Sequence, residues 1–144
     1  MNTPEYQIRR LTTVDEMKQH HSLVNQFYPN LDEQNYINRL EEMIPKGYKQ
    51  VGVFQDHQCV AVSGYWILTR LYCGRYIDVD NFIVDQQHRS AGVGKLLLQW
   101  MEEEGRRLGC RFSILDAYVE NSGAHKFYHR EGYHVRGFHF LKKL

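Results

Sequence analysis

The sequence predicts a fold with both helices and strands (α/β, more closely α+β). We expect a mixed β-sheet with helices on its faces. Segments rich in β-branched and aromatic residues interleave with segments of helical period, without strict alternation. The chain has 144 residues, enough for one buried core, and shows no internal repeat or Gly/Ser linker. We therefore predict a single domain over residues 1–144 with the element order β-α-α-β-β-β-α-β-α-β.

The first half of the chain is predicted to open with a strand and two helices. Residues 6–11 form the strand. Thr13 can cap the first helix, whose apolar residues keep helical spacing until Pro29. Asp32 can cap the second helix, which the run Pro45-Lys46-Gly47 ends. Three strands with β-branched and aromatic composition follow, over residues 48–54, 59–68 and 76–84.

The second half returns to a helical period after Arg89. One stripe of apolar and glycine positions marks a long helix, and Gly109 suits the position just after its end. A strand, a short helix and a final strand are then expected over residues 111–119, 122–130 and 133–144.

The amino-acid composition of the chain argues against several classes of function. Eighteen Lys and Arg against seventeen Asp and Glu give a net charge of +1, so no nucleic-acid partner is expected. Three cysteines without close pairing or ligand spacing indicate reduced thiols and no metal site. The N-terminal residues have no secretory core, and no apolar run approaches membrane-spanning length. We expect a soluble, cytoplasmic protein with no membrane partner.

The segment from Phe82 to Lys95 has the pattern of an anion-binding turn. It joins a strand to the long helix through Gly92 and Gly94. The first turn of a helix leaves N–H groups unpaired, its dipole favours negative charge, and glycines let a pyrophosphate approach the backbone. Arg89 and Lys95 add positive charge beside it. The alternative is a helix that begins with glycines for packing alone.

Two common phosphate motifs fit this turn poorly. The nucleotide P-loop needs more widely spaced glycines and a hydroxyl residue after the lysine, where this chain has Leu96. The dinucleotide fingerprint needs a third glycine, where this chain has Leu97. Both motifs are therefore disfavoured.

The hexad Arg89-Ser90-Ala91-Gly92-Val93-Gly94 resembles the Gln/Arg-x-x-Gly-x-Gly/Ala signature of the GNAT superfamily of acetyltransferases. The segment from Asn121 to Tyr133 resembles the second motif of that family, Asn-x-x-Ala-x-x-Phe-Tyr-x-x-x-Gly-Phe, with Tyr133 in the place of the last aromatic. One helix and one strand separate the two motifs, as the family requires. The resemblance covers about residues 76–134 and implies a central, mostly antiparallel mixed sheet.

Three positions depart from the family pattern. Gln86 replaces a common proline, Ser90 follows Arg89 where a small residue or glycine is usual, and Ala91 fills a position that is often basic. These changes weaken no backbone contact of the motif.

The resemblance implies acetyl-CoA as co-substrate, without a metal. Its pyrophosphate would lie on the turn, and backbone residues 82–84 would pair with the pantetheine arm like an added strand, with one N–H polarising the thioester carbonyl. Asn121 would bind near the pantetheine, unless it only caps its helix. The implied cofactor-binding residues are Phe82, Ile83, Val84, Arg89, Ser90, Ala91, Gly92, Val93, Gly94, Lys95 and Asn121.

Two residues are candidates for the chemistry. The family places the hydroxyl of the residue matching Tyr128 near the CoA sulfur, where a phenol can protonate the leaving thiolate; the alternative is a core aromatic beside Phe127. Asp80 matches a position that is often acidic, and we expect Asp78 and Asp80 to share a strand face with Phe82 and Val84. Asp80 would act as a base or in recognition of a cationic substrate, and the same role is less favoured for Asp78.

The expected function is transfer of the acetyl group of acetyl-CoA directly to a primary amine of a small molecule or peptide. A non-catalytic acyl-CoA-binding regulatory module of the same fold is the alternative. Tyr128 favours the enzyme, because a pure binder has no need of its hydroxyl. The family also suggests a homodimer.

Overall fold

The computed structural model describes residues 5–144. These residues form two compact units, one that ends at Ile114 and one that comprises Leu115–Leu144. Most of the predicted sheet and all but one of the helices belong to the first unit.

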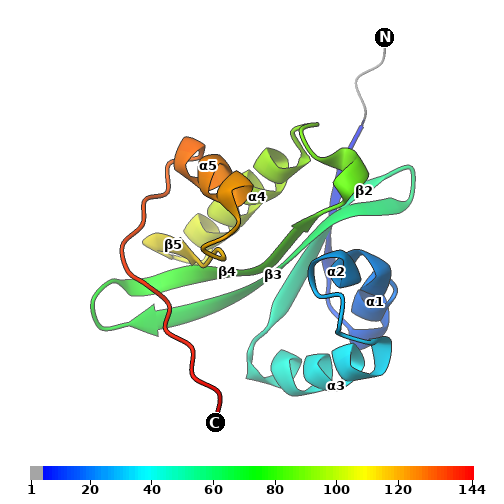
Figure 1. The fold of residues 1–144 in the computed structure, drawn as a ribbon, viewed down its shortest axis with the longest axis horizontal. Helices are drawn as coiled ribbons and strands as arrows, with labels where there is room; N and C mark the ends of the chain where they lie inside the picture. The colour runs from blue at the N-terminus through cyan, green and yellow to red at the C-terminus, as the bar shows by residue number, and fades with distance from the viewer. Residues whose placement is uncertain (1–4) are drawn as a thin grey trace. The chain divides into compact units, whose positions relative to one another are not determined.

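Five strands form one sheet in the spatial order β1-β2-β3-β4-β5 (Figure 1). The pairs β1/β2, β2/β3 and β3/β4 are antiparallel, and the sheet as a whole is mixed and mostly antiparallel, as predicted. The long helix lies between β4 and β5 in the chain and connects these neighbours. The strands are β1 (Gln7–Leu11), β2 (Lys49–Gln55), β3 (Gln58–Arg70), β4 (Gly74–Val84) and β5 (Phe112–Leu115).

Helices cover both faces of this sheet. On one face lie α1 (Val14–Lys18), α2 (His21–Phe27) and α3 (Glu33–Met43), and on the other lies α4 (Val93–Arg107) (Figure 1). Short 3₁₀ turns, η1 (Ile44–Lys46) and η2 (Gln86–His88), follow α3 and β4. The two predicted caps are confirmed: the Thr13 side chain accepts from the Glu16 N–H, and that of Asp32 from the Asn35 N–H.

The hydrophobic core has two parts, one on each face of the sheet. Beneath α1, α2 and α3, side chains such as Met17, Leu40 and Tyr48 pack on Val62 and Ile83. Beneath α4, the predicted stripe residues Leu97, Leu98 and Met101 are at most 1% exposed, and Val93, which lies outside that stripe, is buried as well. This burial fixes α4 on the sheet and therefore fixes the turn that precedes it.

The second unit contains α5 (Ser122–Arg130) and the C-terminal segment. The strand expected over residues 133–144 is not formed: these residues have no regular secondary structure. A strand needs a neighbour that pairs with its backbone, so β-rich composition alone does not produce one. Within this unit, His139 Nδ1 lies 3.1 Å from Asp116 Oδ2.

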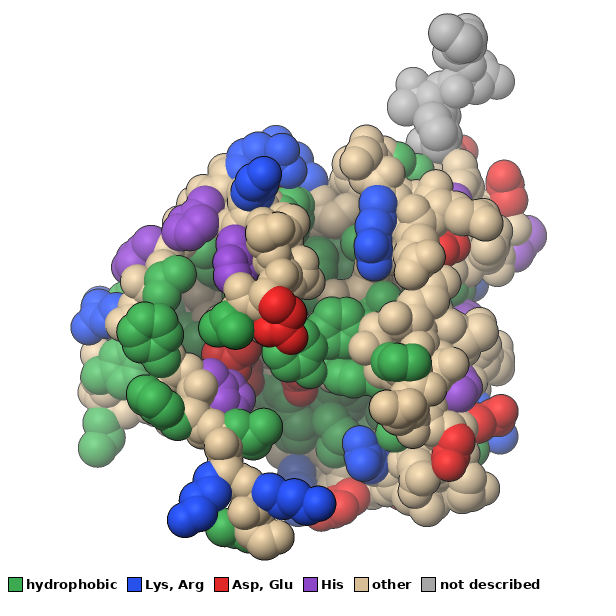
Figure 2. All heavy atoms as spheres, in the orientation of Figure 1, with side chains coloured by type: hydrophobic (Ala, Val, Ile, Leu, Met, Phe, Trp, Pro, Cys, Tyr) green, Lys and Arg blue, Asp and Glu red, His purple; other side chains and the backbone are tan. Residues whose placement is uncertain are grey.

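Two other boundaries also differ from expectation. The predicted first helix is divided into α1 and α2, because the backbone of His20 (φ −109°, ψ 23°) is not helical. The strand expected over residues 111–119 is limited to β5. No helix within residues 5–144 is long and apolar enough to cross a membrane. On the face shown in Figure 2, Lys and Arg side chains do not gather in one patch.

Candidate active site

Strand β4 contains a β-bulge within the predicted catalytic segment. Asp80 pairs with Gly64 and Ile83 pairs with Val62, so two residues of β4 lie opposite Ser63 alone. The first of these two, Asn81, has φ +53°, in the left-handed region that asparagine tolerates better than most residues. The bulge therefore shifts the alternation of β4 by one residue.

The shift at Asn81 changes which side chains of β4 lie on the same face as Asp78 and Asp80. Asp78 and Asp80 lie in regular register opposite Trp66 and Gly64, as their shared face requires. Beyond the bulge, however, Ile83 and not Phe82 packs with Tyr48 in the core beneath α1, α2 and α3. The prediction that Phe82 and Val84 share the face of the two aspartates was wrong, because it assumed unbroken alternation through Asn81.

Hydrogen bonds fix the side chains at the bulge. Asp80 Oδ2 accepts from Trp66 Nε1 at 3.1 Å. Asn81 Oδ1 accepts from the Tyr48 hydroxyl at 2.9 Å, and its Nδ2 donates to the Tyr28 hydroxyl at 2.8 Å. Burial raises the pKa of Tyr48 far above its usual range, so this phenol stays protonated as a donor. Asp80 is thus held in one orientation beside a neutral hydroxyl network.

The network continues into the core. Gln50, only 2% exposed, donates from Nε2 to the hydroxyls of Tyr36 at 2.9 Å and Tyr48 at 3.1 Å. A side chain at Gly64 would overlap the Tyr48 hydroxyl, so glycine there admits the ring. Sequence reasoning missed this network; asparagine within a β-rich run, at Asn81, is the signal that could have indicated a bulge.

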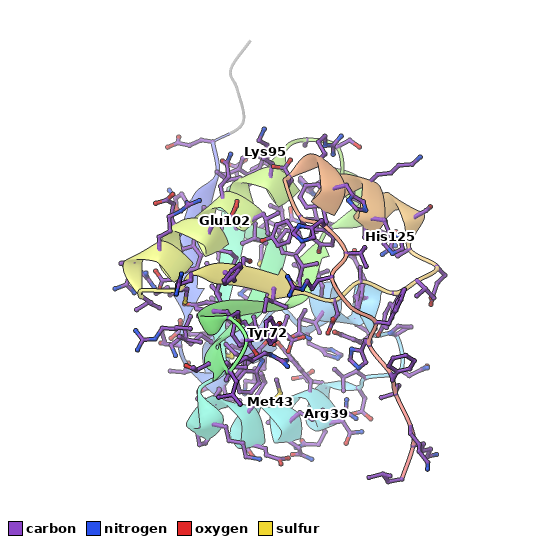
Figure 3. All side chains as sticks on the ribbon, turned by 90° about the vertical axis from the view of Figure 1, so that its left-hand side faces the viewer. Arg39, Met43, Tyr72, Lys95, Glu102 and His125 are labelled. Carbon is purple, nitrogen blue, oxygen red and sulfur yellow. The ribbon has the colours of Figure 1, made fainter. Side chains whose placement is uncertain are left out.

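The glycine turn has the geometry of an anion site. Ser90 and Gly92 both have positive φ, +68° and +83°, and Gly92 is the N-cap of α4 without a side-chain cap. The first N–H groups of α4 therefore receive no side-chain acceptor from the cap residue. Arg89 and Lys95 are exposed, and Figure 3 shows Lys95 near the first turn of α4. A turn of this kind can accept an anion.

Gly92 also addresses the alternative explanation of the turn, in which the helix begins with glycines for packing alone. A Cβ atom built on Gly92 would meet nothing within 4 Å. Close packing therefore does not explain this glycine, whereas its positive φ does. The feature that requires glycine here is the backbone conformation of the turn itself.

Tyr128 and Asn121 belong to the second unit. The Tyr128 ring lies 5.2 Å from that of Phe127 and 5.9 Å from that of Tyr133. Burial raises the pKa of the Tyr128 phenol above its usual range, and the nearby Tyr133 adds to this, so the group remains a proton donor at neutral pH. Asn121 Oδ1 accepts from the Ala124 N–H at 3.1 Å, which makes it the cap of α5. Its contact with pantetheine stays a prediction.

The structure thus places Asp80, residues 82–84 and the turn along one continuous stretch of the first unit, and Tyr128 and Asn121 in the second. Among residues 5–144, no group of three or more His, Cys, Asp or Glu side chains could hold a metal ion. Cys59, Cys73 and Cys110 are free thiols.

Comparison with known proteins gives the same family and fold. The model of the acetyltransferase (GNAT) family matches residues 15–133. The uncharacterized N-acetyltransferase YhdJ of Bacillus subtilis is 23% identical over 139 residues, 95% of this chain and 98% of its own. Glucosamine 6-phosphate N-acetyltransferase 1 of Oryza sativa is 27% identical over 136 residues, covering 89% and 81%. An aminoglycoside N-acetyltransferase solved with CoA shares the fold, with TM-score 0.83, 18% identity and coverage of 99% and 98%.

The uncapped turn, the bulged strand before it and these matches define an acyltransferase that uses acetyl-CoA. The chain belongs to the GNAT family of acetyltransferases and is an acetyl-CoA-dependent N-acetyltransferase.

Proposed function

We propose that this N-acetyltransferase transfers acetyl directly to a primary amine of a small molecule, with a peptide amine as the other possible acceptor. The observation that carries the proposal is the uncapped, left-handed turn at the start of α4, directly after a strand that presents an oriented carboxylate. The rice relative is named for a small-molecule amine, which supports the same acceptor class.

The residues at the turn suit the pyrophosphate of acetyl-CoA. The exposed side chains of Arg89 and Lys95 supply charge, and the backbone from Ser90 to Lys95 supplies N–H donors. Residues 82–84 would pair with the pantetheine arm, and Asn121 would lie near it. Bound acetyl-CoA supplies an activated thioester.

Asp80 and Tyr128 would move the protons. An alkylamine has an unperturbed pKa of about 10.4, so it must lose a proton before it can attack. The Asp80 carboxylate, fixed by Trp66, would take that proton or attract the ammonium form of the acceptor. Tyr128, held protonated by burial, would donate to the departing thiolate.

The test is turnover with a panel of amines, measured by release of free thiol. Tyr128→Phe keeps the ring and removes the proton, so turnover should fall by about 100-fold with acetyl-CoA binding retained, the lower end of general acid effects because a thiolate leaves well. Asp80→Asn should depress the rate most at neutral pH and recover as the amine deprotonates. Tyr72→Phe, on an exposed tyrosine, is the matched control.

Three outcomes are decisive. Wild-type rates in both variants would contradict the assigned roles. A higher KM for the amine without recovery at higher pH would assign Asp80 to recognition alone. A thermal shift with acetyl-CoA but no thiol release with any amine would favour the regulatory module instead.

A further inference from the structure

Helix α2 is bonded to the first residues of the cofactor turn. Gln26 donates from Nε2 to Asp85 Oδ1 at 3.2 Å and accepts the Gln86 N–H at its Oε1, also at 3.2 Å. One side chain therefore contacts two successive residues that lie about 60 positions away in the chain. The buried side chains of Leu23 and Val24 fix α2 on the sheet.

The same residues of the turn are bonded to the sheet. Asp85 donates its N–H to the Val60 carbonyl at 2.9 Å, and its Oδ1 accepts the Gln87 N–H at 3.3 Å. Asp85 Oδ2 lies 3.3 Å from His88 Nδ1, and His88 Nε2 lies 3.2 Å from Gln55 Oε1 on β2. Asp85 is thus the residue at which contacts from α2, β3 and η2 converge.

The end of α2 also reaches the bulge. Tyr28, the C-cap residue of α2, accepts at its hydroxyl from Asn81 Nδ2 at 2.8 Å. Contacts from α2 therefore flank the segment from Phe82 to Val84 on both sides, at Asn81 and at Asp85. This is the segment expected to pair with pantetheine.

We propose that Gln26 is a positioning residue for the cofactor: with Asp85 it braces the start of the turn on α2, so that the backbone donors are ordered before acetyl-CoA binds. This inference rests on the proposed function, because it takes the turn as the pyrophosphate site. Fixing backbone in advance lowers the entropic cost of binding, so loss of the brace weakens binding without removing any contact to the ligand.

The expected loss of acetyl-CoA affinity depends on how exposed the Gln26 side chain is. Gln26 is exposed, and a cavity of about 290 Å³ borders both Gln26 and Asp85, so water can replace the lost bonds. Two hydrogen bonds of this kind correspond to a change of about 3- to 10-fold in affinity. The effect should appear in the dissociation constant and KM for acetyl-CoA, with kcat preserved.

The test changes the hydrogen-bond donors and acceptors at Gln26 and Asp85. Gln26→Glu keeps an acceptor for the Gln86 N–H but sets a second carboxylate against Asp85, and acetyl-CoA should bind about 3- to 10-fold more weakly. Adding Asp85→Asn to that variant removes the repulsion and restores a donor–acceptor pair, but the same Asp85 oxygen also accepts the Gln87 N–H, so affinity should recover in part. Gln34→Glu, which makes the same exchange at an exposed position of α3 away from this cavity, should leave affinity unchanged.

Amide exchange of the unliganded protein gives an independent reading. In Gln26→Glu the Gln86 amide should exchange several-fold faster than in wild type, and the double variant should restore its protection. Wild-type affinity and exchange in Gln26→Glu, or equal weakening by Gln34→Glu, would each overturn the brace. If wild type itself does not bind acetyl-CoA, the proposed function fails, and amide exchange still decides on the brace.

Discussion

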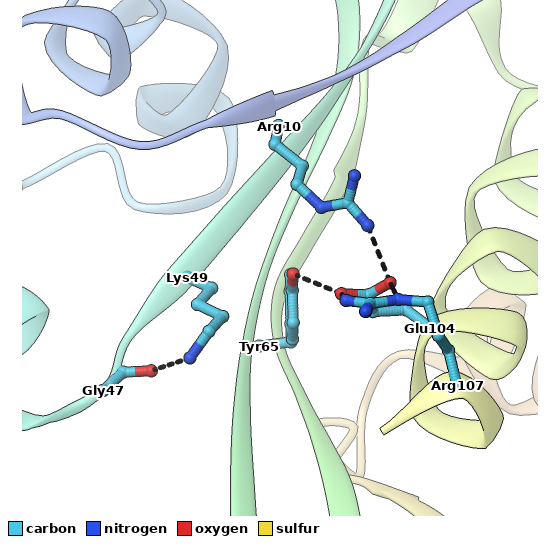
Figure 4. A network of polar contacts seen from close by, with 6 residues as sticks. All are labelled: Arg10, Gly47, Lys49, Tyr65, Glu104 and Arg107. Atoms are coloured by element: carbon cyan, nitrogen blue, oxygen red, sulfur yellow. Dashed lines mark hydrogen bonds and ion pairs between the residues drawn. The ribbon is translucent and has the colours of Figure 1, made fainter. Parts of the chain in front are cut away.

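The two ends of helix α4 are held in opposite ways. At its start, Gly92 caps the helix without a side chain, and the charged residues nearby are exposed. Near its end, Glu104 is 5% exposed and bonds to Arg10 Nη2 at 2.8 Å, Arg107 Nη2 at 2.7 Å and the Tyr65 hydroxyl at 3.5 Å (Figure 4). One end leaves backbone donors open, whereas the other satisfies a buried charge.

The difference shows how one helix serves binding and stability separately. Glu104 connects α4 to β1 through Arg10 and to β3 through Tyr65, so its bonds are made within the folded chain. The uncapped start forgoes the stabilisation of an N-cap side chain, roughly 1 kcal/mol, and leaves N–H groups for an anion. Substitutions at the two ends should therefore affect different measurements.

The largest effect on acetyl-CoA binding is expected at the start of α4, where Gly92 provides no side-chain cap. Gly92→Asp places a carboxylate where the pyrophosphate is proposed to lie, and acetyl-CoA affinity should fall by about 100-fold or more, since like charges in contact cost several kcal/mol. Gly92→Asn adds a side chain of the same shape at the same positive φ but no charge, so it is the matched control. Calorimetric titration with CoA measures both. Equal affinities for the two variants would place the phosphate elsewhere.

The next effect is expected at the buried end. Glu104→Gln removes the charge that Arg10 and Arg107 share, and the free energy of unfolding should fall by about 2 kcal/mol. The two arginines are more than half exposed, which lets water compensate in part. Urea unfolding measures the loss, and CoA affinity should be that of wild type. A stable variant with weakened CoA binding would contradict the separation of the two ends.

Much of α4 and its turn could be predicted from the sequence because the signals are local. The apolar stripe, the glycine pattern and the caps at Thr13 and Asp32 depend on residues a few positions apart. Glu104 could not be assigned to the core, because its partner Arg10 lies 94 positions away. Its neighbours in the sequence gave no reason to treat it differently from the exposed glutamate beside it.

The candidate site was predicted in part for the same reason. The position of Asp80 and the turn follow from short motifs, whereas the bulge at Asn81 depends on how β3 and β4 pair. The brace at Asp85 brings together residues from α2, β3 and η2, which no local pattern connects. The missing strand over residues 133–144 shows the converse, since a suitable composition without a pairing partner remains irregular.

A smaller effect tests the packing beside Glu104. A Cβ atom on Gly105 would lie 2.9 Å from Ile77 Cγ2, so Gly105→Ala should destabilise the protein by about 1 kcal/mol, even though alanine favours helix by a similar amount. Gly123→Ala in α5 is the control, because its Cβ would have only an ordinary contact with Asn121 at 3.8 Å. It should be neutral or slightly stabilising. Thermal unfolding of both variants checks this, and a stabilised Gly105→Ala would contradict the close approach of α4 to β4.

The smallest expected effect is the pH dependence of the buried end. Hydrogen bonds from Arg107 lower the pKa of Glu104. Burial opposes this shift, but the bonds and charges of Arg107 and Arg10 together outweigh it. Because the native pKa lies below the unfolded value near 4.5, the stabilisation is fully present above that value and is lost as the pH falls through the native pKa.

Wild type alone cannot isolate this contribution. Burial alone would raise the pKa of Asp85, but hydrogen bonds from Gln26, the Gln87 N–H and His88 outweigh it and lower this pKa, so acid also weakens the contacts of Asp85. The difference in unfolding free energy between wild type and Glu104→Gln cancels the Asp85 contribution, since both proteins retain it. That difference should be constant from neutral pH to about 5.5 and should shrink as the pH falls below the unfolded pKa of a glutamate. A difference that grows in acid would mean that Glu104 is not the charged partner of the two arginines.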